Sequence, residues 1–164
     1  MGNVCDGALE RDGSRRVALV TGGSRGIGRA CAVGLAEDGY DIAVVYAGSV
    51  DAAHETCEAC EVAGATARAY QCDVADPDAV NACVEAVLSD FGSIWALVNN
   101  AGIMDGFEPI GNISDERWDK VFAVNVKGPM YAMRKAVQVM LGQETKGNIV
   151  NVASIGGTNG ARAG

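Results

Sequence analysis

The feature that most constrains this chain is a glycine-rich turn, Thr21–Gly28, with the sequence TGGSRGIG. It follows the apolar run 17–20, which is typical of a strand buried in a parallel sheet. A helix is predicted to begin within this turn, at Gly26. Its first backbone N–H groups and the positive end of its dipole would then face an anion bound at the turn. Because glycines let a backbone approach a pyrophosphate closely, the turn predicts a phosphate-binding strand–turn–helix. The spacing is G-x3-G-x-G rather than the commoner G-x-G-x-x-G, and a glycine-rich loop without a ligand is the alternative.

Strand-like apolar runs alternate with helix-like segments along the chain, which predicts βαβ units and a parallel sheet. Strands are expected near residues 16–21, 41–46, 66–72, 94–98 and 147–152. Helices are expected near residues 26–38, 50–63, 76–90 and 114–141. Asp76 and Pro77 suit the first turn of the third helix, and Ser114 suits the cap of the fourth. The expected fold class is therefore α/β, with a doubly wound parallel sheet.

Composition narrows the possible partners and compartments. The length of 164 residues fits one domain, and a hydrophobic content of 49% with 5% aromatics indicates an aliphatic core. A net charge of −8 argues against nucleic acid or an anionic membrane as a partner. No apolar run reaches transmembrane length and no signal peptide opens the chain, so we expect a cytoplasmic protein. Residues 1–15 are expected to be a frayed or disordered terminus, and residues 16–164 the dinucleotide-binding domain.

The six cysteines are expected to be reduced thiols, because no secretory signal precedes them. Cys57 and Cys60 form a lone C-x2-C pair inside a helical stretch, with His54 three residues earlier. A metal site would need a second ligand pair or a loop geometry. The pair is therefore predicted to consist of ordinary helix-surface or packing residues, and no metal site is expected.

Polar residues follow three of the expected strands at their carboxyl ends, the edge at which doubly wound sheets bind ligands. Asp73 can accept a hydrogen bond from an adenine amino group, and a helix cap or turn is the alternative. In the segment 99–102, with the sequence NNAG, the paired asparagines can satisfy backbone groups where the strand ends, and the Ala and Gly leave room for a ribose. A structural turn is the alternative. Ser154 follows the fifth strand. Asn125 lies inside the expected fourth helix, where asparagine is a poor helix former, which suggests a backbone distortion that serves a site.

In combination these features resemble the short-chain dehydrogenase/reductase family. The resemblance implies a Rossmann-type doubly wound parallel sheet in three α/β/α layers, with five strands present in the order 3-2-1-4-5. The resemblance covers the chain from about Arg16 to its last residue, and it is greatest for members of the 3-oxoacyl-carrier-protein reductase and sugar or steroid dehydrogenase type. The motifs that carry it are TGGSRGIG at 21–28, CDV at 72–74, NNAG at 99–102, NV at 125–126 and NVAS at 151–154.

The resemblance implies roles for particular residues. The implied cofactor-binding residues are Gly22, Ser24, Arg25, Gly26, Ile27, Gly28, Asp73, Val74, Asn99, Ala101 and Gly102. The glycines of the turn would line a pyrophosphate, Asp73 and Val74 would hold the adenine, and the NNAG segment would line a ribose. Ser154 would polarise the substrate carbonyl, and Asn125 would hold a water in a proton relay. The implied activity is hydride transfer between a nicotinamide and a carbonyl or alcohol group of a small molecule.

The resemblance also sets expectations that the chain does not meet. Family members place a catalytic Tyr-x3-Lys motif after the serine, whereas this chain ends at Gly164 without one. We therefore expect these 164 residues to be inactive alone, to lack the family's last strands, and to leave the fifth strand as an exposed edge. A non-catalytic dinucleotide-binding module or sensor is the alternative function. Tyr131 and Lys135 have the Tyr-x3-Lys spacing but precede the serine, so a packed tyrosine and a solvated lysine are expected. A complete protein is expected to be a homodimer or homotetramer through the helix 114–141.

The second strand bears on cofactor choice. An NAD-preferring site usually offers an acid to the ribose 2′-hydroxyl just after this strand. Here the segment 44–49 carries no carboxylate, and Asp51 lies further on in the next helix. Arg25 lies inside the glycine turn, where its guanidinium can pair with a 2′-phosphate, although a plain surface arginine is the alternative. NADP(H) is therefore expected over NAD(H).

Overall fold

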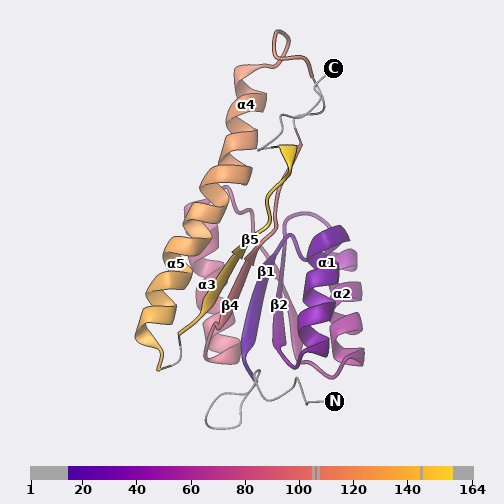
Figure 1. Cartoon of the computed structure of the whole chain (residues 1–164), viewed down its shortest axis with the longest axis vertical. Coiled ribbons are helices and arrows are strands. Elements are labelled where there is room, and N and C mark those ends of the chain that lie inside the picture. Colours follow the sequence, from indigo (N-terminus) through magenta and orange to yellow (C-terminus); the bar gives the residue numbers. More distant parts are fainter. Residues whose placement is uncertain (1–14, 105, 107, 145, 157–164) are drawn as a thin grey trace.

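A computed structural model describes residues 15–104, 106, 108–144 and 146–156 of the chain. The predicted frayed terminus therefore lies almost entirely outside the described residues, as does Cys5. The described strands are β1 (Val17–Thr21), β2 (Asp41–Tyr46), β3 (Ala67–Gln71), β4 (Ala96–Asn99) and β5 (Asn148–Asn151). They form one parallel sheet in the order β3-β2-β1-β4-β5, as predicted. Figure 1 shows β1 near the centre of this sheet.

Helices cover both faces of the sheet, which gives the three predicted layers. The helical segments are α1 (Gly26–Glu37), α2 (Val50–Val62), α3 (Pro77–Phe91), α4 (Asp115–Phe122), η2 (Ala123–Lys127) and α5 (Gly128–Gly142). In Figure 1, α1 and α2 lie together on one side of the sheet, and α3 and α5 lie on the other. The segment α4 continues α5 beyond the carboxyl end of the sheet.

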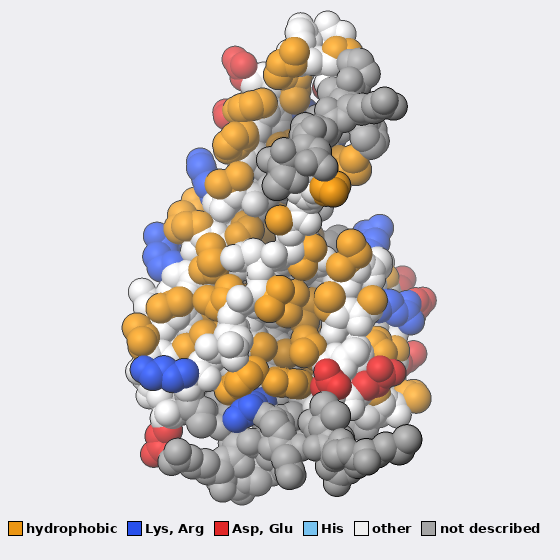
Figure 2. All heavy atoms as spheres, viewed as in Figure 1, with side chains coloured by type: hydrophobic (Ala, Val, Ile, Leu, Met, Phe, Trp, Pro, Cys, Tyr) orange, Lys and Arg blue, Asp and Glu red, His pale blue; other side chains and the backbone are white. Residues whose placement is uncertain are grey.

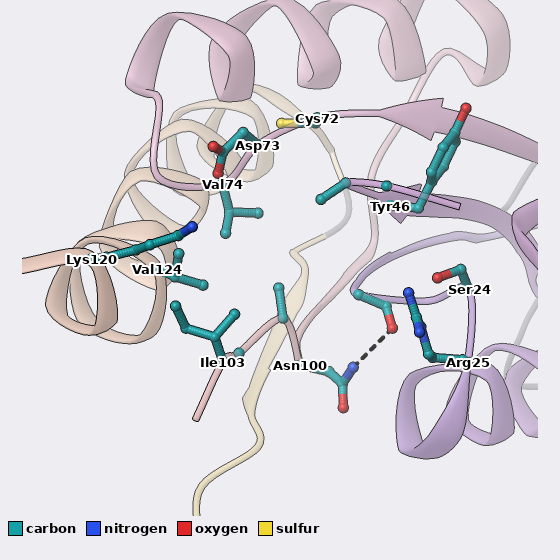
Figure 3. A pocket seen from close by; sticks show the side chains of 15 residues that line it. Ser24, Arg25, Tyr46, Cys72, Asp73, Val74, Asn100, Ile103, Lys120 and Val124 are labelled. Carbon is teal, nitrogen blue, oxygen red and sulfur yellow. Dashed lines mark hydrogen bonds between the residues drawn. The ribbon is translucent and has the colours of Figure 1, made fainter. Parts of the chain in front are cut away.

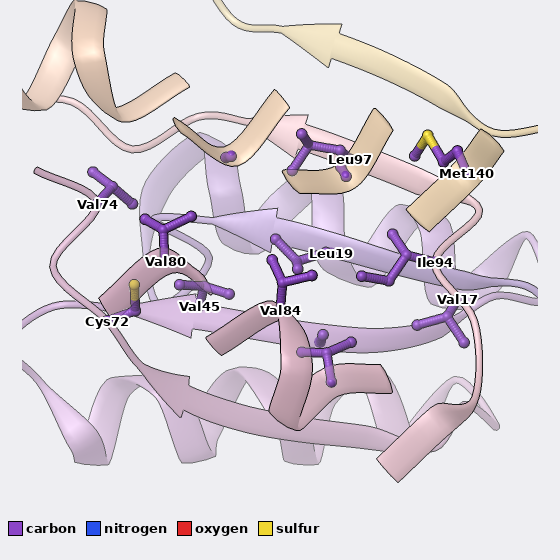
Figure 4. Close-up of a cluster of buried hydrophobic side chains, with 14 residues drawn as sticks. Val17, Leu19, Val45, Cys72, Val74, Val80, Val84, Ile94, Leu97 and Met140 are labelled. Atoms are coloured by element: carbon purple, nitrogen blue, oxygen red, sulfur yellow. The ribbon is translucent and has the colours of Figure 1, made fainter. Parts of the chain in front are cut away.

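Two apolar clusters fill the spaces between the layers. Leu19 and Val45 point into the cluster under α3 and α5 (Figure 4), whereas Val20 and Val44 point into the cluster under α1 and α2. Successive side chains of a strand alternate between faces, so a strand covered on both faces must be apolar at every position. This is why β1 is buried along its whole length.

The predicted helix starts are confirmed by their hydrogen bonds. The Asp76 carboxylate accepts from the backbone N–H groups of Asp78 and Ala79, and Pro77 is the first residue of α3. The Ser114 hydroxyl oxygen accepts from the backbone N–H of Arg117 at the start of α4. These bonds satisfy N–H groups that have no partner within the helix.

Two sequence predictions need correction. The helix expected over 114–141 is not uniform, because a π-helical segment, η2, separates α4 from α5. Asn125 lies at the middle of η2, so the backbone distortion that it suggested is present. The fourth strand was expected to end at residue 98, whereas Asn99 is its last residue. The strand extends because Asn99 pairs with Asn151 of β5 and its carbonyl accepts from the Val152 N–H.

Candidate functional site

The carboxyl ends of β1, β2, β3 and β4 border a cavity of about 520 Å³ (Figure 3). It is lined by Gly22, Ser24 and Arg25 of the turn, and by the segments 46–48, 72–74 and 100–103. Lys120 and Val124 close it from α4 and η2. The cavity thus lies at the edge where open α/β sheets bind ligands.

The glycine turn forms one end of this cavity. Gly22 and Gly26 have φ values of 63° and 55°, in the left-handed region that favours glycine. A Cβ on Gly28 would lie 2.2 Å from the Gly22 carbonyl oxygen, so α1 can pack this closely on the turn only with glycine there. The residue before α1 is Arg25, whose side chain makes no capping hydrogen bond. The first N–H groups of α1 therefore keep the anion-binding capacity of an uncapped helix start.

A hydrogen-bond network fixes the turn to the end of β4. The Thr21 hydroxyl donates to the Val98 carbonyl at 3.3 Å and accepts from the backbone N–H groups of Asn100 and Ala101 at 3.0 and 3.1 Å. The Asn100 amide donates to the carbonyls of Thr21 and Gly22, both at 3.1 Å. Figure 3 draws one of these bonds. Asn100 therefore satisfies backbone carbonyls of the turn, as expected of the paired asparagines, and it also lines the cavity.

Asp73 and Val74 line the opposite end of the cavity. The Asp73 Oδ1 accepts from the Ala75 N–H at 2.9 Å, so this aspartate also holds the turn that leads into α3. Lys120 and Val124 face this end from the long helix (Figure 3). Sequence reasoning missed Lys120, Tyr46 and Cys72 as lining residues, because their apolar or helical contexts gave no signal of a shared site.

Asn125 does not line the cavity but holds a residue that does. Its Oδ1 accepts from the Ile103 N–H and its Nδ2 donates to the Ile103 carbonyl, both at 2.8 Å. A π-helical turn inserts an extra residue and is often found at functional sites. Here the widened turn brings the amide to the backbone that follows β4.

Asn99 and Ser154 also lie outside the cavity lining. The Asn99 amide is buried and donates to the Asn151 side-chain oxygen at 2.9 Å, on the side of β5. The exposed Ser154 hydroxyl oxygen accepts from the Gly156 N–H at 3.1 Å. Within the turn, Gly26, Ile27 and Gly28 are not among the residues that line the cavity. The Ile27 side chain is 65% exposed.

Tyr131, which has the Tyr-x3-Lys spacing with Lys135, does not line the cavity. Tyr131 packs against the core under α3 and α5, as predicted, with the Arg134 guanidinium 5.3 Å from its ring centre. Lys135 is partly exposed, and its ammonium also pairs with the exposed Glu85 at 2.9 Å. The packing of α3 against α5 brings these two charges together.

Of the two possibilities for Cys57 and Cys60, surface or packing, the structure has packing, in the core between α2 and the sheet. Burial is the main cause that raises the pKa of each thiol to about 11. Within the described part of the chain, no group of three His, Cys, Asp or Glu side chains is placed to hold a metal ion. No helix among the described residues has the length and apolar character to cross a membrane.

Comparison with known proteins identifies the class that this fold and cavity define. The family model for short chain dehydrogenases matches residues 16–164, and the chain belongs to this family of oxidoreductases. It is 44% identical over 143 residues to the 3-oxoacyl-[acyl-carrier-protein] reductase FabG of Staphylococcus aureus, covering 87% of this chain and 57% of that protein. It is 40% identical over 147 residues to galactitol 2-dehydrogenase of Agrobacterium fabrum, covering 90% and 56%.

Solved structures show the same relationship. The structure of NAD⁺-bound xylitol dehydrogenase matches with a TM-score of 0.85 and 35% identity, covering 90% of this chain and 56% of that one. Levodione reductase matches with a TM-score of 0.85 and 34% identity, covering 90% and 57%. The chain thus spans little more than half the length of the relatives that it matches.

Proposed function

We propose that the complete protein is an NADP(H)-dependent oxidoreductase that acts on a carbonyl or alcohol group of a small molecule. The observation that carries the proposal is that one cavity joins an uncapped helix start at the glycine turn to Asp73 and Val74. A pyrophosphate suits the first end and an adenine suits the second. A bound nicotinamide would supply the hydride chemistry.

In this proposal the chain's own residues bind and orient the dinucleotide and the substrate. The turn glycines and Ser24 hold the phosphates, and the NNAG segment, through Ala101 and Gly102, borders the ribose. Asn125 holds Ile103 in the wall of the cavity. Ser154 is the proposed carbonyl-polarising group, on the segment that leaves β5 at the same edge of the sheet.

The preference for NADP(H) rests on charges at the end of β2. Arg25 lines the cavity together with Tyr46, Ala47 and Gly48, and this part of the lining carries no carboxylate. Asp51 belongs to the first turn of α2. A guanidinium in this place favours a 2′-phosphate over a free hydroxyl.

A titration with a matched control tests this choice. Arg25→Ala is expected to weaken NADPH binding by about 1–3 kcal/mol, the cost of losing a hydrogen bond to a charged group, and to leave NADH binding unchanged. Arg29→Ala, one turn along α1, removes a cation that pairs with Glu55 outside the cavity lining, and it should change neither affinity. Equal losses for both cofactors with Arg25→Ala would remove Arg25 from the proposed role.

We also propose that the 164 residues alone show no measurable turnover. No Tyr-x3-Lys follows Ser154 in them, and a positioned general acid contributes about 10²–10⁴ in rate. The test is the absorbance of NADPH with a panel of ketones. Turnover by this chain would refute the proposal. Binding without turnover in a complete protein would instead favour the second candidate, a non-catalytic dinucleotide-binding module.

For the complete protein we propose a homodimer or homotetramer formed through the long helix. Large apolar side chains are exposed along one stretch of it, namely Trp118, Phe122, Val126, Met130, Val137 and Leu141. Figure 2 shows hydrophobic side chains gathered over the protruding α4 and over the face that carries β5 and α5. Exposed apolar patches of this kind mark interaction surfaces. Light scattering tests the proposal, and a monomer at micromolar concentration would count against it.

A further inference from the structure

The buried face of α2 carries one hydroxyl group. The face has the spacing i, i+3, i+4 and i+7 of an apolar helical stripe, and its residues are Ala53, Thr56, Cys57 and Cys60. The alanine and both cysteines belong to the apolar cluster under α1 and α2, and Thr56 is completely buried. A hydroxyl in such a place lowers stability unless it is hydrogen-bonded, so its partners show what Thr56 does.

Thr56 joins α2 to the glycine turn. Its hydroxyl lies within hydrogen-bond distance of two carbonyl oxygens, that of Ala52 at 3.0 Å and that of Ser24 at 3.2 Å. The bond to Ala52 is one that threonines inside helices often make with the preceding turn. The bond to Ser24 instead crosses 32 residues of sequence. Because the hydroxyl donates to both oxygens, it fixes the Ser24 carbonyl relative to α2.

This bond is one of three that hold successive residues of the turn. The Gly23 N–H donates to a carbonyl of β2 at 2.9 Å. The Ser24 carbonyl accepts from Thr56, and the Arg25 carbonyl accepts from the Arg29 N–H of α1 at 3.2 Å. The peptide groups on both sides of Arg25 are therefore held, which fixes the point from which its long side chain leaves the backbone.

The residues held in this way line the cavity. Ser24 and Arg25 lie at the end that is completed by the segment 46–48, and Figure 3 shows their side chains near Tyr46. The same segment leads from β2 into α2, whose first turn is capped by the Ser49 hydroxyl. A movement of the turn relative to α2 would therefore change the space between Arg25 and the segment 46–48.

We infer that Thr56 is a positioning residue that holds Ser24 and Arg25 at the separation from the segment 46–48 that a 2′-phosphate requires. The inference rests on the proposed function and adds to it a residue that does not line the cavity. A hydrogen bond between a guanidinium and a phosphate depends on geometry, and a site that is held in place before binding binds more tightly. The Thr56 hydroxyl thus contributes to the choice between NADP⁺ and NAD⁺ without touching either.

The first experiment tests the positioning without a ligand. Thr56→Val keeps the branched shape of the side chain and removes the hydroxyl, whereas Thr56→Ser keeps the hydroxyl. In NMR spectra of the full 164-residue chain, the Arg25 amide resonance should shift in Thr56→Val and stay near its original position in Thr56→Ser. Cys60→Ala, one turn further along the same buried face, is the control and should leave this resonance in place. An unshifted Arg25 resonance in Thr56→Val would overturn the inference.

The second experiment measures the affinities of these variants for NADP⁺ and NAD⁺ by calorimetric titration. Thr56→Val should raise the dissociation constant of NADP⁺ about three- to tenfold, the loss expected for one hydrogen bond, and change that of NAD⁺ much less. Thr56→Ser should restore the preference for NADP⁺. Cys60→Ala should unfold at a lower urea concentration and keep the preference, which a merely structural role of Thr56 would not distinguish from Thr56→Val.

The outcomes separate the inference from the proposed function. A parent chain that binds neither dinucleotide, or that binds both equally, would overturn the proposed cofactor choice and the role of Thr56 with it. A parent that prefers NADP⁺, together with a Thr56→Val variant of unchanged preference, would overturn the inference alone. A preference that Cys60→Ala loses to the same extent would also overturn it, because the effect would then follow stability.

Discussion

Replacing Gly28 by alanine tests how closely α1 must approach the glycine turn. A Cβ at this position would lie 2.2 Å from the Gly22 carbonyl oxygen and 2.5 Å from the Asn100 Nδ2. The oxygen belongs to the backbone, and the Asn100 amide is held by two hydrogen bonds of 3.1 Å. Neither neighbour can move without breaking a contact that positions the cavity, so the substitution is expected to damage both stability and ligand binding.

The magnitude follows from these contacts. Forcing an extra methyl into a packed site costs about 1–3 kcal/mol. Displacing the Asn100 amide loses a further ~1 kcal/mol for a hydrogen bond. We therefore expect the free energy of unfolding to fall by about 2–4 kcal/mol, a large fraction of the roughly 5–15 kcal/mol that is typical of a domain. Affinity for NADP⁺ should fall with it, because the turn is displaced.

The same helix offers a matched control. Gly34 lies in the interior of α1, and a Cβ there would have no heavy atom of the neighbouring structure within 4 Å. Gly34→Ala should therefore stabilise the protein by about 1 kcal/mol through helix propensity. Urea denaturation followed by circular dichroism measures both variants. A Gly28→Ala protein whose stability lies within about 0.5 kcal/mol of the parent would refute the reasoning.

Two further predictions concern other contacts. Asn125→Ala removes both hydrogen bonds to Ile103, so the free energy of unfolding measured in urea should fall by about 1–2 kcal/mol. The Ile103 amide hydrogen should also exchange faster with solvent, and an unchanged exchange rate would contradict this expectation. Asp90 accepts from the Tyr70 hydroxyl at 2.7 Å and pairs with Arg68 at 2.8 Å, and these partners lower its pKa. The stabilisation is present above the aspartate pKa of the unfolded chain and is lost as the pH falls through the lowered folded value. Asp90→Asn should therefore flatten the loss of stability on acidification below the aspartate pKa of the unfolded chain, and an unchanged pH dependence there would count against the contact.

Much of the architecture could be predicted because its signals are local. The apolar run of β1, the caps at Asp76 and Ser114, and the glycines of the turn each act on their immediate neighbours in the sequence. Alternation of strands and helices then left few possible sheet topologies. The family could be predicted for the same reason, because each of its motifs is short and contiguous.

The cavity lining could be predicted in part. Asp73, Val74, Ala101 and Gly102 do line it, but their roles toward a cofactor remain proposals. The sequence could not assign the two asparagines of the NNAG segment, because neighbouring residues at the end of a strand point to opposite sides. In the structure the Asn99 side chain bonds to Asn151 of β5, whereas the Asn100 side chain bonds to the backbone of the glycine turn.

The sequence by itself determined the alternation of strands and helices, the places where helices begin, and the glycine turn between β1 and α1, because each depends on residues a few positions apart. The tertiary structure alone decided that Lys120 faces Asp73 across the cavity and that Lys135 pairs with Glu85. These contacts join separate elements, and their geometry depends on how helices pack on the sheet. Propensity and periodicity carry no information about which side chains such packing brings together.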